Sequence, residues 1–422
     1  MSALPSPFLH ALRGAFDAQT AATDLQRHAF AEFLQAGLPT TRLDGWKYTD
    51  LRRLATKQFQ NAPRTPQVES PLLLPFAEAI LFVDGALHLP KSLEKRSDGL
   101  QATVVARETH APSAQVSSLP QAERAFERLN AAFAADALAM HVADHATLAS
   151  PIYIAYVWTA AAADAMRHPR WSLTLGHHSR ATLIEHHVGI DQAANLTNTV
   201  SSISVGAGAE LSHTRLQDDA TTHFDIHASD IQVDGHGFYR QHNYILGAAL
   251  ARSDVRVTLA APEARVELHG LMCAHGAQHL DIRACIRHEA SHTQSRAEYR
   301  GIADQRGRVV FNGKVTVVPN AQRIDAAQSS RNLLLSPHAE IDTRPELEIY
   351  ADDVKCAHGA TVGQLDDAAL FYLQSRGIAR SEARALLTHA FAAELIERIP
   401  EPALRAHVLS RFMQGMRAEA PE

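Results

Sequence analysis

Residues 179–186 read SRATLIEH, and the same texture returns in AGAELSHT (207–214), GHGFYRQH (235–242) and PEARVELH (262–269). In each stretch, small or turn-forming residues precede a run in which apolar and polar side chains alternate, which is typical of a half-buried β-strand. Aligned on Ala181, Ala209, Gly237 and Ala264, the stretches recur after 28, 28 and 27 residues. Two later stretches, RGRVVFNG (306–313) and PHAEIDTR (337–344), fit the series at longer, irregular spacing.

This repeat predicts a mainly β protein built as a solenoid. No apolar helical stripe lies between the alignment positions, which disfavours leucine-rich and helical repeats. Short strands that are joined by turns and repeated along one axis indicate a β-helix, in which each coil buries its inward side chains against the next. A β-sandwich is the alternative, because strand texture does not separate the two folds.

The texture of the chain divides it into three regions. We expect an N-terminal helical region over residues 1–78 and a β-helix core over 79–350, with a helical insertion at about 121–140. A C-terminal helical region follows over 351–422, in which Ser381 is the expected N-cap of a long helix and Pro400 its stop. Apolar residues at steps of four mark two helices there, namely Ala383, Leu387, Phe391, Leu395 and Ile399, then Leu404, Val408 and Phe412.

Composition excludes several classes of protein. The 422 residues include 46 acidic and 40 basic side chains, giving a net charge of −6 with no basic stripe, so a nucleic-acid binder is not expected. Three cysteines are too few for a disulfide framework. The first residues show no signal peptide, and the most apolar window contains Pro151 and alternates like a strand rather than a membrane span. We therefore expect a cytoplasmic protein without a membrane partner, whose 25 histidines lie mostly on solvated strand faces.

The stretch KCAHGATVG (355–363) carries the strongest candidate for chemistry. In an extended segment, Cys356 and His358 point to the same face. Thiolate and neutral imidazole both suit iron, although two ligands do not complete a site. The remaining cysteines, Cys273 and Cys285, are expected inside the solenoid as small apolar groups. Spacing alone leaves open whether Cys356 and His358 form a ligand pair or a structural pair.

Two kinds of catalysis lack their motifs in this sequence. No G-x-x-x-x-G-K-[ST] phosphate-binding loop is present, and no C-x-x-C redox pair is present. The ends of a solenoid, by contrast, expose strand edges that must be capped or paired with another chain. We therefore expect that the chain does not hydrolyse ATP, and that an uncovered solenoid end is a natural site for a partner.

A set of longer motifs resembles the SufB/SufD family of iron–sulfur cluster assembly proteins. The signature runs from Asp352 to Ile378, and the Cys-x-His-Gly-Ala form and the chain length are similar to the SufD branch. Further stretches that resemble the family occur in the same order along almost the whole chain: WKYTDL (46–51), AFERLNAAFAADAL (125–138), HEASHTQSRAEYRGI (288–302), FNGKVTVVPNAQRIDAAQSSRNLLLS (311–336) and PELEIYADDVKCAHGA (345–360).

The resemblance implies a right-handed parallel β-helix flanked by helical regions, acting as a non-catalytic scaffold. It implies a complex with a SufB-like subunit, joined β-helix to β-helix, and with a SufC-like ABC ATPase that hydrolyses the ATP. The cargo is a transient iron–sulfur cluster at the junction, with none bound tightly to the isolated chain. The family's junction histidine matches His358, a tentative metal ligand shared with the partner, and Cys356 is its neighbour. The ATPase contact would fall on Tyr372, Arg376, Gly377, Ile378 and Phe391.

Two other functions stay open at this point. One is a SufB-like scaffold that works as a homodimer, which the isolated chain could also form. The other is a β-helix enzyme acting on polysaccharide, which would need a groove lined with clustered carboxylates.

Overall fold

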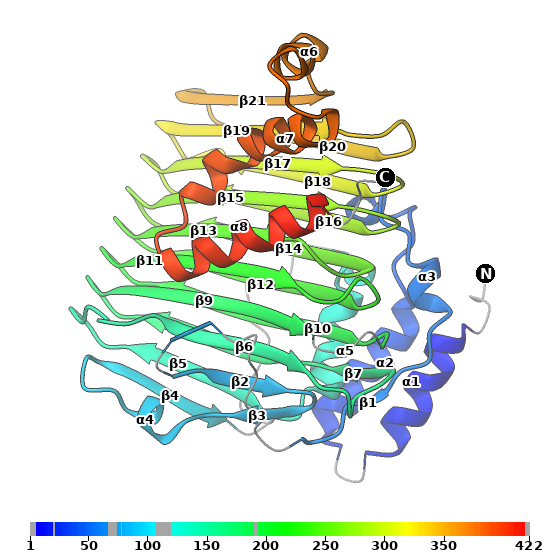
Figure 1. Ribbon diagram of the computed structural model, residues 1–422. Coiled ribbons are helices and arrows are strands. Elements are labelled where there is room, and N and C mark those ends of the chain that lie inside the picture. The colour runs from blue at the N-terminus through cyan, green and yellow to red at the C-terminus, as the bar shows by residue number, and fades with distance from the viewer. Residues whose placement is uncertain are drawn as a thin grey trace.

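The computed structural model describes residues 6–19, 22–65, 74–76, 78–105, 120–189 and 193–417. It is a parallel β-helix with helices near both ends of the chain, as Figure 1 shows. The helices are α1 (Pro7–Asp17), α2 (Asp24–Ala36), η1 (Asp44–Trp46), α3 (Arg52–Ala55), α4 (Lys91–Glu94), η4 (Gln121–Arg124), α5 (Ala125–Phe133), α6 (Asp367–Ser375), α7 (Arg380–Glu397) and α8 (Pro402–Arg417).

The strands form two sheets that face each other. The first has the order β20-β18-β16-β14-β12-β10-β8-β5-β4, and the second β21-β19-β17-β15-β13-β11-β9-β6-β2-β3. From β8 to β21, successive strands alternate between the sheets, and each pairs in parallel with the strand of the next coil, so the β-helix is confirmed and the sandwich alternative is wrong. Their bounds are β1 (Gln60–Asn61), β2 (Ile80–Val83), β3 (Ala86–His88), β4 (Leu100–Val105), β5 (Ala137–Val142), β6 (Ile152–Trp158), β7 (Ala165–Arg167), β8 (Arg170–Leu175), β9 (Arg180–Gly189), β10 (Leu196–Val205), β11 (Glu210–Asp218), β12 (Phe224–Val233), β13 (Phe238–Ile245), β14 (Leu250–Leu259), β15 (Arg265–Ala274), β16 (His279–His288), β17 (Gln294–Ala303), β18 (Arg308–Val317), β19 (Ile324–Leu334), β20 (Glu340–Ile349) and β21 (Val354–Gly363).

The register corrects the expected repeat in two places. Arg180, Glu210, Phe238 and Arg265 pair in turn, so the coil lengths here are 30, 28 and 27 residues. The first expected alignment position, Ala181, therefore lies two residues after the position that is in register with Ala209. The stretches at 306–313 and 337–344 lie on β18 and β20 of the opposite sheet, which explains why their spacing did not fit.

Three large apolar clusters stabilise the described part of the molecule. The largest fills the interior between the two sheets, where aliphatic side chains from successive coils stack on one another. A second joins α1, α2 and α5 to the outer face of the first sheet, and a third joins α7 and α8 to the outer face of the second. Each helical region therefore covers one outer face, as Figure 1 shows for α7 and α8.

The N-terminal region is fastened to its sheet by a buried charge network. The guanidinium group of Arg252 on β14 lies 3.9 Å from the ring centroid of Trp46 and pairs with Asp254 at 2.8 Å and with Asp281. Thr49 donates a hydrogen bond to Asp281 as well. The motif WKYTDL is thus a docking segment, in which an aromatic ring and a hydroxyl group satisfy charges on the sheet.

The region boundaries differ from those expected. Strand β21 falls inside residues 351–422, so the helical part of this region begins only at Asp367. The insertion at 121–140 is helical only to Phe133 and ends in β5, and part of the boundary near residue 78 (66–73 and 77) lies outside the described residues. The long helix is capped at Ala379 without a side-chain bond, so the Ser381 N-cap was wrong. The sequence texture changes near residue 351, but residues 354–363 still form the last strand because they pair along their length with β19.

The expected apolar stripe of the C-terminal helices is largely confirmed. Ala383, Leu395, Leu404, Val408 and Phe412 are all buried. These helices pack on the side of the β-helix, however, and not over its end, because the apolar outer face of the second sheet is there to receive them. Among the described residues, no helix combines the length and apolar character needed to cross a bilayer.

Candidate functional site

The two ends of the β-helix differ in how they are closed. At the N-terminal end, short antiparallel strands finish both sheets: β3 pairs with β2, and β4 pairs with β5. At the other end, β20 and β21 are the last strands of their sheets and have no neighbour beyond them among the described residues. Most residues of these two strands are exposed or half-buried, whereas the preceding coil is largely buried. The last coil is therefore an open edge.

Cys356 and His358 lie on this open edge and face the interior. Strand register places Cys356 beside Ala326 and His358 beside Gln328. Ala326 belongs to the interior cluster, and Gln328 reaches across the interior to donate a hydrogen bond to the Gly313 carbonyl oxygen at 3.2 Å. Because paired residues on neighbouring strands share a face, the thiol and the imidazole also face inward, at the point where the interior opens to solvent.

The surroundings of Cys356 and His358 distinguish their chemistry. Burial, with the nearby carboxylate of Asp325, raises the pKa of the Cys356 thiol above its ordinary value. The protonated thiol therefore dominates at neutral pH, and metal binding there requires loss of the proton. The imidazole of His358 is exposed and makes no hydrogen bond or ion pair with the side chains of the described residues, so it is available to a ligand. Of the two, His358 is better prepared to bind a metal in the free chain.

A groove of about 730 Å³ adjoins the same edge on the outer face of the second sheet. It reaches from β13 to β21 and ends at Ala357–Gly359. Its arginines are already neutralised, since Arg240 pairs with Glu267 at 2.7 Å and Arg398 with Glu298 at 2.9 Å. No sequence pattern predicted this groove, because its lining combines residues of five strands with Arg398 at the end of α7.

Four of the five residues expected to contact an ATPase lie on or just after α6, beyond the last coil, whereas Phe391 lies on α7 beside β17. Tyr372 is exposed on α6, with the Arg376 guanidinium 5.2 Å from its ring centroid. Gly377 ends α6 with φ +87°, a conformation that favours glycine, and Ile378 follows it. Phe391 is half-buried on α7 beneath the side chain of Arg300, so it is a packing residue of the third cluster as well.

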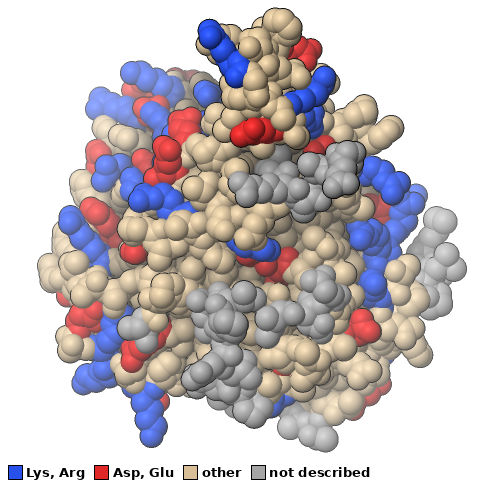
Figure 2. Space-filling view, in the orientation of Figure 1, with Lys and Arg blue, Asp and Glu red and all other residues tan. Residues whose placement is uncertain are grey.

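A further aromatic residue on α6 did not emerge from the sequence. Phe371 is 74% exposed, and Leu370 is the buried residue of this helix. The signal was the run ALFYL, which holds more large apolar side chains than one helix face can bury. Figure 2 shows α6 as a projection whose surface is mostly neither acidic nor basic. The helix thus offers an aromatic surface that the chain itself does not cover.

Comparison with known proteins decides the family. The protein-family model described as SUF system FeS cluster assembly, SufBD core domain, matches residues 157–391 of this chain. This chain belongs to the SufBD family.

Two relatives extend the match beyond the core domain. The iron–sulfur cluster assembly protein SufD of Escherichia coli (strain K12) is 32% identical over 400 residues, covering 93% of this chain and 92% of that protein. The iron–sulfur cluster assembly SufBD family protein slr0076 of Synechocystis is 29% identical over 392 residues, covering 88% and 86%. This SufBD chain is therefore a homologue of SufD in the SUF system of iron–sulfur cluster assembly.

Two expectations about individual side chains of this SufBD chain were wrong. Many of its histidines are buried rather than solvated, among them His168, His186, His187, His213, His223, His227, His242, His269 and His288. Cys273 packs under the C-terminal helices, and Cys285 lies between the inward-facing Ala284 and Ile286, so neither thiol faces the interior. Alternation along a strand places Cys273, His186, His242 and His269 on the outer face of the second sheet, beside the C-terminal helices. Other buried histidines face the interior instead: His187 stacks on Tyr156, and His213 contacts Tyr239 and Glu185.

Proposed function

We propose that this chain is a non-catalytic SufD-type scaffold subunit. Its last coil joins a SufB-like subunit, and α6 with the start of α7 joins a SufC-like ABC ATPase. A nascent iron–sulfur cluster is the cargo of the complex and is held at the junction of the two β-helices before transfer to apo-proteins. ATP hydrolysis belongs to the SufC-like partner.

The observation that carries this proposal is the open last coil with its inward-facing imidazole. Strand edges that stay unpaired recruit another edge, and pairing by backbone hydrogen bonds is a general mode of recognition. A sister β-helix would continue both sheets and place its own inward side chains opposite Cys356 and His358. His358 then supplies one ligand and the partner supplies others, because one imidazole does not hold a cluster alone.

The junction can be tested by adding a charge to the last coil. Val362 on β21 is 44% exposed, so Val362→Asp leaves the isolated chain folded but introduces a carboxylate into the proposed interface. In co-expression with SufB-like and SufC-like subunits of the same organism, we expect recovery of the mixed complex on affinity purification to fall at least about tenfold, since an unpaired buried charge is costly.

A matched control is available at the opposite end of the molecule. Val104 on β4 is also 44% exposed, and Val104→Asp should leave the complex intact. Equal recovery for both variants would contradict the proposed junction. A wild-type chain that forms a cluster-binding homodimer and ignores the SufB-like subunit would support the homodimer alternative instead.

The aromatic surface of α6 gives a separate prediction for the ATPase contact. The double change Phe371→Glu and Tyr372→Glu affects exposed side chains, so circular dichroism and thermal unfolding should match the wild type. Binding of the SufC-like ATPase in a pull-down should fall at least about tenfold, because exposed aromatic anchors carry much of the energy of an interface. Leu25→Glu, at a side chain 61% exposed on α2, is the control and should bind normally. Unchanged ATPase binding by the double variant would place the contact elsewhere.

A further inference from the structure

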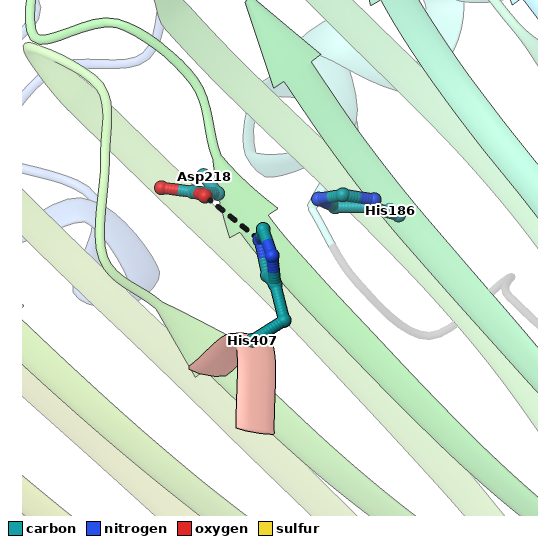
Figure 3. Close-up of side chains that lie close together, drawn as sticks. All are labelled: His186, Asp218 and His407. Atoms are coloured by element: carbon teal, nitrogen blue, oxygen red, sulfur yellow. Dashed lines mark hydrogen bonds and ion pairs between the residues drawn. The ribbon is translucent and has the colours of Figure 1, made fainter. Parts of the chain in front are cut away.

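Three potential metal ligands meet beneath α8, far from the last coil. His186 comes from β9, Asp218 from the end of β11 and His407 from α8, as Figure 3 shows. Each offers one ligand atom, and these atoms all lie within 4.8 Å of one another. The Nε2 atom of His407 is 3.4 Å from Oδ2 of Asp218, and the two imidazole rings are 5.2 Å apart between centroids.

The side chain of His186 points to a missing partner. It is 1% exposed, and its Nε2 atom has no hydrogen-bond partner among the described residues. Its Nδ1 atom lies 3.0 Å from the hydroxyl group of Tyr153. When Nδ1–H donates to the Tyr153 oxygen, the lone pair of Nε2 is free for a metal, and such a second hydrogen bond commonly orients metal-binding histidines.

We propose that His186, Asp218 and His407 bind one divalent first-row transition metal, Zn²⁺ or Fe²⁺, which fastens α8 to the β-helix. Two imidazoles and one carboxylate, with coordination positions left for water, suit both ions and are poor ligands for Mg²⁺ or Ca²⁺. Ligand atoms around such an ion are about 3.4 Å apart. Rotation of side chains, above all that of His407, closes the remaining gap.

Arg411 sets a limit on the affinity of this site. Its Nε atom lies 2.8 Å from Oδ1 and 2.7 Å from Oδ2 of Asp218. A metal must share this carboxylate with the guanidinium group and is repelled by its charge. The side chain of Arg411 is 43% exposed and can turn toward solvent when the ion binds. Removing the guanidinium group should therefore strengthen metal binding.

The test uses the full chain after removal of bound metal with a chelator. Zn²⁺ is titrated by calorimetry in air and Fe²⁺ under anaerobic conditions, with Mg²⁺ as the negative control. We expect one equivalent of Zn²⁺, Fe²⁺ or both, and the ion that binds identifies the metal. His407→Gln should lower the affinity for this ion at least about tenfold, and Arg411→Gln should raise it. His338→Gln, at an exposed turn, should leave the affinity unchanged.

A chemical readout locates the ion independently of affinity. His407 is half-buried, and bound metal should protect it from modification by diethyl pyrocarbonate, as measured by mass spectrometry of its peptide. Equal affinity and stoichiometry in His407→Gln and wild type, or no protection of His407, would overturn the proposal and leave a simple His–Asp ion pair. The site lies on β9, β11 and α8, so this result does not depend on the junction at β21.

Discussion

Replacing His358 by alanine is expected to lower the iron and sulfide bound by the reconstituted complex at least about tenfold, the usual scale for losing a group that supports a metal site. His358 is exposed in the free chain, so the change removes a ligand without opening a cavity. Folding and assembly with the SufB-like and SufC-like subunits should therefore stay normal. Iron and acid-labile sulfide are measured after anaerobic reconstitution, with complex formation followed by size-exclusion chromatography.

Cys356→Ser is the matched comparison for this variant. Because burial keeps the Cys356 thiol protonated at neutral pH, its loss should lower cluster content less than the loss of His358 does. Loss of the complex itself in His358→Ala would show that the imidazole is a packing residue. Full cluster content in His358→Ala would show that the cluster is held elsewhere.

Replacing Arg252 by alanine should produce the largest loss of stability, about 3–5 kcal/mol, the cost of breaking a buried ion pair. The guanidinium group is 1% exposed and forms ion pairs with Asp254 and Asp281. It also lies over the ring of Trp46 and donates a hydrogen bond to the carbonyl oxygen of Gly45. Burial alone would lower the pKa of Arg252, but the two carboxylates raise it, so the group is charged. The variant leaves both carboxylates buried without their cation, and urea unfolding measures the cost.

The pH dependence of this loss has a definite sign. In the wild type, burial raises the pKa of Asp254, but Arg252, Arg283 and Arg256 together outweigh it and hold this pKa below its ordinary value. The ionised Asp254 therefore stabilises the fold at neutral pH and less so as pH falls. Burial keeps the pKa of Asp281 above its ordinary value even beside Arg252. In the variant, both carboxylates lose the charge of Arg252, so burial raises their pKa further and protonation relieves part of the penalty at lower pH. The difference between variant and wild type should thus be smaller at pH 5 than at pH 8. Arg323→Ala, which breaks an exposed pair with Asp353, should cost less than about 1 kcal/mol.

The fold could be predicted from the sequence because its information is local and repeated. Small residues before alternating runs, recurring near every 28 residues, specify coils that stack in parallel, and the stripe through Leu404, Val408 and Phe412 specifies an amphipathic helix. The spacing of Cys356 and His358 likewise requires that they share a face in any extended strand. These features depend on neighbours within a few residues or on one repeat length.

The open edge, the burial of the histidines and the metal-ligand cluster depended on which distant surfaces pack together. The sequence could not show that the edge at β21 stays open while the edge at β3 is closed by a hairpin, since both end as ordinary strands. Nor could it show that histidines on outward faces become buried, because the covering helices come from the ends of the chain. His407 meets Asp218 across 189 residues of sequence, and no local pattern connects them. Local periodicity determined the coils and helices, whereas the packing of distant segments decided which polar groups are sheltered together and which edge is left to a partner.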